Sequence, residues 1–136
     1  MNDKLTLKFH VQENGWLPID ISVGDTKVEI DASDVPREPI SELIEAIEKC
    51  FLNNTESEAW LHLEPHYYKW SFIPSGEEVK IKIYFVKVGY NENKETLKLE
   101  YTGSYRELLL TLWRSIKEYI SRQEGYEKAL YLVEKR

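Results

Sequence analysis

The feature that most constrains this fold is a two-residue alternation of apolar and polar side chains along most of the chain. In residues 4–11, Leu5, Leu7, Phe9 and Val11 alternate with polar residues. Because successive side chains of a β-strand point to opposite faces, this period predicts a strand with one buried and one wet face. The same pattern predicts strands at residues 16–23, 26–31, 59–64, 67–74, 78–88 and 95–101.

Short turns between these segments favour antiparallel pairing. Gly24-Asp25 separates residues 16–23 from 26–31, and glycine suits a two-residue hairpin because it tolerates positive φ. Pro74-Ser75-Gly76 provides a similar turn before residue 78. After Phe85 the alternation shifts phase, which predicts a β-bulge or a local twist. In the last strand, residues 95–101, we expect Leu97 to point inward.

A helical period marks two further segments. Residues 39–52 place apolar side chains on one helical face, at Ile40, Leu43, Ile44, Ile47 and Phe51. Ser104 and Glu107 form a capping box that predicts a second helix over residues 105–123. Gly125 is expected to interrupt or end this helix. Residues 126–134 are then expected to form a short further helix, with a C-terminal strand as the alternative.

Together these elements predict an α+β fold. We expect a two-layer domain with a largely antiparallel sheet of about six to seven strands and two or three helices packed on one face. No linker or internal repeat divides the 136 residues, so residues 1–136 are expected to form a single domain.

Composition points to a soluble cytoplasmic protein. The single cysteine, Cys50, allows no intrachain disulfide, which fits a reducing compartment. The first residues lack the basic and apolar regions of a secretory signal, and no apolar run reaches the roughly 18–20 residues that span a bilayer. We therefore expect cytoplasmic localisation and no membrane partner.

The charge is unevenly distributed. The net charge is −6, and residues 20–48 hold nine acidic against two basic side chains. Nucleic-acid binding requires the opposite sign, so we expect no nucleic-acid partner. An acidic surface would attract a basic protein partner, while the simpler alternative is that these charges serve solubility.

No motif for catalysis, a metal or a cofactor stands out. His62, Glu64 and His66 resemble a ligand set, but Pro65 precludes the helix that a zinc-protease motif needs. Cys50 lies between apolar residues of the first predicted helix, where a packing role is the expected one. All glycines are isolated, which excludes a glycine-rich phosphate loop. We expect no catalytic residue, no metal and no cofactor, and hence no enzyme.

Aromatic residues predict an interaction surface. If Tyr68, Trp70 and Phe72 face the core, Trp60, Tyr67 and Tyr84 lie on the other face of the sheet. Charged or titratable side chains are expected around them, at His10, Asp20, Glu29, His62, Lys69, Lys80 and Lys82. Such a face could anchor a protein, stack another ligand, or merely stabilise the sheet through cross-strand pairs.

Several segments resemble a known group of proteins. The resemblance covers residues 16–72 and is carried by Trp16-Leu17-Pro18-Ile19-Asp20-Ile21, Gly24-Asp25, Ala32-Ser33, Pro39-Ile40, and Glu64-Pro65 followed by Tyr68 and Trp70. These residues are similar to the start of small, acidic bacterial α+β proteins, some of which are immunity proteins of toxin–immunity systems. The resemblance implies a cytoplasmic, non-catalytic domain that binds a toxin domain.

The sequence therefore predicts a non-enzymatic protein-binding domain, and the leading interpretation is an immunity protein that neutralises a basic toxin domain. The predicted contact residues are acidic or aromatic: Asp31, Asp34, Glu38, Glu42 and Glu45, with Trp16 or Trp60 as the anchor. Two alternatives stay open. One is a small-molecule binder or enzyme with a pocket between sheet and helices. The other is a homo-oligomeric structural protein that pairs through its exposed sheet or an edge strand.

Overall fold

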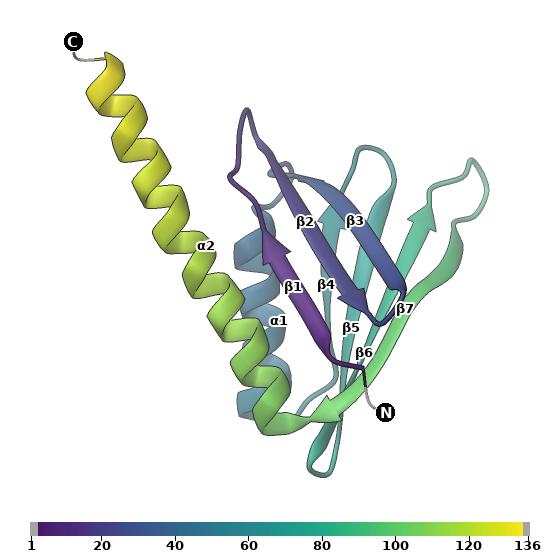
Figure 1. Cartoon of the computed structure of the whole chain (residues 1–136). Helices are drawn as coiled ribbons and strands as arrows, with labels where there is room; N and C mark the ends of the chain where they lie inside the picture. Colours follow the sequence, from purple (N-terminus) through teal and green to yellow (C-terminus); the bar gives the residue numbers. More distant parts are fainter. Residues whose placement is uncertain (1–2, 135–136) are drawn as a thin grey trace.

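The computed structural model describes residues 3–134 (Figure 1). Seven strands and two helices follow one another along the chain: β1 (Leu5–Phe9), β2 (Trp16–Val23), β3 (Thr26–Ser33), α1 (Pro39–Asn53), β4 (Ser57–His62), β5 (Tyr67–Ser75), β6 (Glu78–Lys87), β7 (Lys94–Ser104) and α2 (Tyr105–Glu134). All paired strands are antiparallel, which confirms the predicted α+β class.

The strands form two sheets where the sequence predicted one. The first has the order β1-β2-β3 and the second β4-β5-β6-β7. Helix α1 lies along the edge of β4. The Ser57 hydroxyl donates to the Ala46 carbonyl at 2.6 Å, and the Trp60 backbone N–H donates to the Glu42 carboxylate at 3.2 Å. These contacts cover part of the free edge of β4.

One hydrophobic core joins both sheets and both helices. Helix α1 packs mainly against β4, and α2 packs mainly against β1. The inner faces of the strands are fully buried, as at Ile19 and Ile21 of β2, Trp70 of β5, and Ile81 of β6. A fully buried side chain of this kind contributes roughly 1.5–3 kcal/mol through removal of apolar surface from water.

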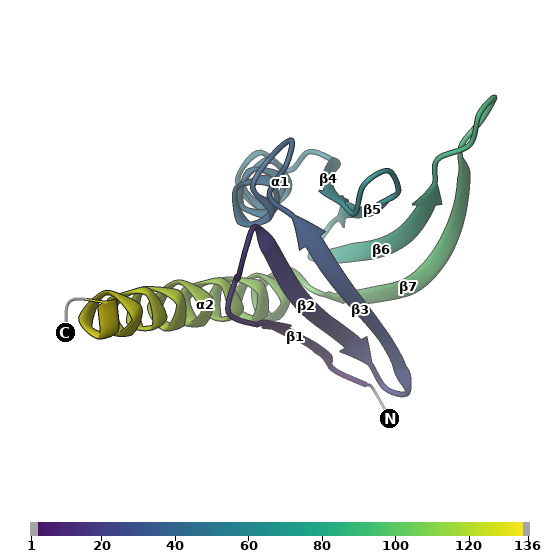
Figure 2. The same cartoon turned by 90° about the horizontal axis from the view of Figure 1, so that it is seen from above.

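A bulge lies between β6 and β7, but its extra residue is in β7 and not after Phe85, where the sequence predicted it. The register moves from Ile83 opposite Leu99 to Tyr84 opposite Leu97, so that Lys98 is the extra residue. One extra residue moves the following side chains to the other face of a strand. The expectation that Leu97 points inward is therefore wrong: Leu97 lies beside Tyr84 and is 46% exposed. Figure 2 shows β6 and β7 curving along their length.

Helix α2 continues through Gly125 to Glu134, so the predicted break at Gly125 is wrong. A glycine in the interior of a helix costs only about 1 kcal/mol relative to alanine, which is too little to end a helix with good formers on both sides. The short helix expected over residues 126–134 is the end of α2, and the alternative of a strand there is excluded. In the described part of the chain, neither helix has the length and apolarity needed to cross a bilayer.

Candidate functional site

The strongest candidate site is the outer face of the four-stranded sheet, which is the side turned away from the core. The strand register aligns Trp60 of β4, Lys69 of β5, Tyr84 of β6 and Leu97 of β7 across this face. We call these four residues the central row. Trp60 at one end is 41% exposed, whereas Ala59 and Leu61, its neighbours on the inner face, are buried. The central row therefore presents apolar surface to solvent.

The rings on this face are held in place by stacking and charge. The indole of Trp60 stacks on Tyr67, with ring centroids 4.7 Å apart and an interplanar angle of 15°. The Lys69 ammonium lies 4.9 Å from the centre of the Tyr84 ring and 2.6 Å from the Glu95 carboxylate. The hydrogen bond from Lys69 to Glu95 raises the pKa of Lys69 and outweighs the opposing effect of partial burial. Rigid aromatic side chains lose little entropy on binding, which suits them to anchor a partner.

A charged hollow of about 200 Å³ lies next to Trp60, between α1 and β4. The Glu42 carboxylate lines it and contacts Arg37 at 2.7 Å, and Arg37 also contacts Glu45 at 2.8 Å. Glu45 contacts Lys49 as well, at 3.5 Å. The hydrogen bond from Arg37 lowers the pKa of Glu45 and raises that of Arg37. The acidic residues of α1 are thus partly neutralised by neighbouring cations.

The structure brings together only some of the predicted contact residues. Trp60, Glu42 and Glu45 line the same hollow. Glu38 instead caps α1, where its carboxylate accepts hydrogen bonds from the backbone N–H groups of Ile40 and Ser41 at 2.9 and 2.8 Å. This contact satisfies donors that would otherwise have no partner at the start of the helix.

The other predicted residues belong to the three-stranded sheet. Trp16 pairs in register with Ser33, next to Asp34, at one end of β2 and β3. The Asp34 N–H donates to the Gly15 carbonyl at 2.9 Å, which holds these two segments together. Asp31 lies opposite Pro18 in the register and is exposed. The acidic residues among the predicted contacts are therefore spread over two regions.

The sequence predicted one outer face around Trp60, but some of the residues expected on that face belong to the other sheet. His10, Asp20 and Glu29 lie on or beside the three-stranded sheet and not around Trp60, and the His10 imidazole pairs with Asp20 at 2.8 Å. Sequence reasoning placed Lys69 and Tyr84 correctly beside the aromatic residues, but it missed Leu97. The nearest signal was the phase shift after Phe85, but it lies in β6 and not at the bulge in β7.

The residues considered for chemistry have structural roles. His66 Nδ1 accepts a hydrogen bond from the Val88 N–H at 3.0 Å, and Glu64 accepts one from the Ser33 hydroxyl at 3.1 Å. Cys50 is fully buried, and this burial raises its pKa to about 11. Among residues 3–134, no three His, Cys, Asp or Glu side chains are grouped so that they could hold a metal ion.

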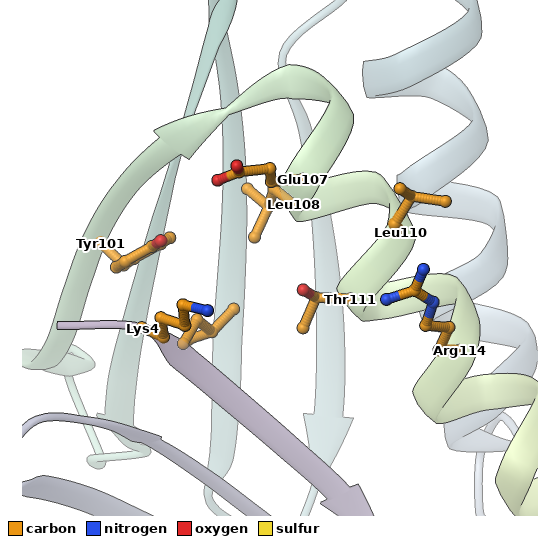
Figure 3. Close-up of a pocket in the computed structure, with 8 residues that line it drawn as sticks. Lys4, Tyr101, Glu107, Leu108, Leu110, Thr111 and Arg114 are labelled. Carbon is orange, nitrogen blue, oxygen red and sulfur yellow. The ribbon is translucent and has the colours of Figure 1, made fainter. Parts of the chain in front are cut away.

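A shallow pocket of about 230 Å³ lies where α2 meets the ends of the sheets (Figure 3). Lys4, Tyr101 of β7, and Glu107, Thr111 and Arg114 of α2 line it. It is smaller than the roughly 300–1,000 Å³ of most small-molecule sites. The pocket therefore gives little support to the alternative of a small-molecule site.

Comparison with known proteins shows that the chain shares its fold with a solved structure. No protein-family model matches the sequence, and none of the curated proteins matches it. The structure is similar to a chain of the CdiA-CT/CdiI toxin and immunity complex from Enterobacter cloacae, with a TM-score of 0.55 and 14% sequence identity. The similarity covers 85% of this chain and 99% of that chain. At this identity the likeness supports the resemblance to proteins of toxin–immunity systems at the level of the fold alone.

Proposed function

We propose that this chain is a non-enzymatic, cytoplasmic bacterial protein that acts as an immunity protein. In this role it binds a toxin domain and blocks it by covering its surface. The fold shared with a chain of a toxin and immunity complex supports the proposal. The observation that carries it is the central row, which offers exposed and firmly positioned apolar side chains on an open sheet face.

The central row has the properties of a binding hot spot. Interface energy is concentrated in a few well-packed aromatic or charged residues surrounded by contacts that exclude water. Trp60 would provide the largest buried area, with Tyr67 fixing its ring from below. Leu97, 46% exposed, would extend the apolar contact to the far edge of the sheet.

The chemistry next to Trp60 favours a basic partner. Three carboxylates, those of Glu42, Glu45 and Glu58, line the hollow against the two cations Arg37 and Lys49. A lysine or arginine of the toxin domain could lie on the exposed indole ring and near Glu45 or Glu58, since cations bind to tryptophan faces. The net charge of −6 would speed the approach of such a partner.

Purification of the chain from its native host at low salt, followed by identification of bound proteins, tests this proposal first. We expect one predominant basic protein. Recovery of no protein partner would contradict the proposal, because an interface steered by charge is strongest at low ionic strength.

The binding face is tested with matched variants and the recovered partner. We expect Trp60→Ala to raise the dissociation constant by about 30-fold, the size typical of a hot-spot residue. Trp113→Ala on α2 is the control, because Trp113 is 47% exposed and lies on the helix that packs mainly against β1 of the other sheet. Glu45→Lys should mainly slow association. Equal effects of Trp60→Ala and Trp113→Ala would remove the outer face from the proposal.

A further inference from the structure

Helix α2 carries a second apolar stripe that nothing else in the fold requires. Its first stripe, Leu108, Leu112, Ile116 and Tyr119, is buried against the core. The second contains Leu110, Trp113 and Ile120, which are 38%, 47% and 41% exposed. Arg106, Lys117 and Glu124 continue it, so that the six positions alternate between spacings of four and three residues. This heptad spacing is typical of the contact seam between two helices.

We propose that two copies of this chain pair through the second stripe, with their α2 helices antiparallel about a two-fold axis level with Ser115. The six side chains are arranged symmetrically around this residue. Leu110 and Ile120 lie five residues on either side of it, and Trp113 and Lys117 lie two residues on either side. Arg106 and Glu124 lie nine residues on either side.

This symmetry makes the stripe complementary to itself. In an antiparallel pair, residues equally far from the axis on opposite sides meet across the interface. Leu110 would pack on Ile120 of the second copy, and Trp113 would lie under Lys117 of the second copy in a cation–π contact. Arg106 would form an ion pair with Glu124 of the second copy. The two-fold axis repeats each of these contacts once.

Other pairings of the same stripe are less favourable. Parallel helices in register would place Lys117 against Lys117 and Glu124 against Glu124 of the second copy. An antiparallel shift of one seam position in one direction would bring Lys117 against Lys117, and a shift in the other would bring Arg106 against Ile120 and Lys117 against Leu110. Like charges and buried unpaired charges oppose all of these arrangements. Charge complementarity therefore selects a single register.

The three charged side chains of the second stripe are free to make these contacts. Arg106, Lys117 and Glu124 are exposed and have no ion pair within the described residues. Figure 1 shows α2 projecting past the sheets, and the paired segment from Arg106 to Glu124 would be about 28 Å long at 1.5 Å per residue. An interface of this size is small, so we expect a dissociation constant of about 10–100 μM. The outer face with Trp60 stays available to another partner.

Sedimentation velocity of the full chain over a range of concentrations tests the pairing. We expect dimers near 100 μM that dissociate on dilution. Arg106→Glu and Glu124→Arg should each raise the dissociation constant by about tenfold, because two ion pairs become two repulsions. Combining both substitutions in one chain should restore dimerisation. Arg114→Glu, the same charge change on an exposed position outside the stripe, should have no effect.

Cross-linking tests the direction of the helices. Under mild oxidation, a mixture of Leu110→Cys and Ile120→Cys chains should form a mixed disulfide. Neither variant alone should cross-link, since its two cysteines would lie about 15 Å apart along the helices. A chain that is monomeric at all concentrations would overturn the proposal. Dimers that are insensitive to Arg106→Glu, or that the combined substitution fails to restore, would overturn it as well.

Discussion

Removal of the Glu42 side chain is the sharpest test of how the binding face is held in place. Its carboxylate is only 14% exposed and contacts Arg37 at 2.7 Å. The other carboxylate oxygen accepts the Trp60 backbone N–H at 3.2 Å. This donor belongs to the edge of β4, where no further strand could satisfy it. Glu42 therefore joins α1 to the backbone of β4 at Trp60.

The expected cost follows from these contacts. A hydrogen bond to a charged group contributes about 1.5–3 kcal/mol, and its removal leaves a donor partly shielded from water. We expect Glu42→Ala to lower the free energy of unfolding by about 2 kcal/mol, which for a domain of this size lowers Tm by roughly 6–10 °C. Glu42→Gln keeps an oxygen for the Trp60 N–H and should cost about half as much.

Urea unfolding of the variants provides the measurement, with Glu45→Ala as the control. Glu45 contacts the same Arg37 but is far more exposed, so its removal should change stability little. If Glu42→Ala destabilises the chain no more than Glu45→Ala does, Glu42 does not hold the edge of β4. If the prediction holds, Glu42 is a structural residue, and Glu45 and Glu58 are the carboxylates left to contact a cation of the partner.

Four further outcomes are expected. Trp70 is fully buried and its indole N–H has no hydrogen-bond partner among the described residues, so Trp70→Phe should cost less than about 1.5 kcal/mol in urea unfolding, against about 3–5 kcal/mol for Trp70→Ala. Burial raises the pKa of Cys50 to about 11, so its reaction with a thiol reagent at pH 8 should be slow until the chain unfolds. Arg37 lowers the pKa of Glu45, so the ion pair stabilises the folded state at pH values above 4.5, the ordinary pKa of a glutamate. The small Tm difference between the wild type and Glu45→Gln should therefore shrink as the pH falls below 4.5. We also propose that the chain is one cooperative unit, and circular dichroism and tryptophan fluorescence should then report the same unfolding midpoint.

Much of the local structure was predictable from the sequence. The alternation in residues 16–23 gave the correct strand, and Gly24 and Gly76 take the positive φ values of 57° and 61° that their turns require. The period of residues 39–52 gave helix α1 to within one residue of its end. These features depend only on the directions of side chains within one segment. They can therefore be predicted from the order of apolar and polar residues, without knowledge of the rest of the fold.

The candidate site was less predictable because it depends on which segments become neighbours. The acidic residues of α1 looked like a free anionic surface, yet Arg37 turns back onto Glu42 and Glu45. Trp60 and these carboxylates meet only because α1 packs on the edge of β4. Leu97 reached the outer face through a single extra residue in β7.

The sequence by itself determined where most of the strands and helices lie and which side of most of them is apolar, because hydrophobic periodicity follows from backbone geometry alone. The tertiary structure decided that the strands divide into two sheets, which residues share the outer face, and which charges neutralise one another. These outcomes depend on strand pairing and on contacts between segments far apart in the chain. A local pattern predicts whether one face of a strand or helix is polar or apolar, but it does not predict which other segment will pack against that face.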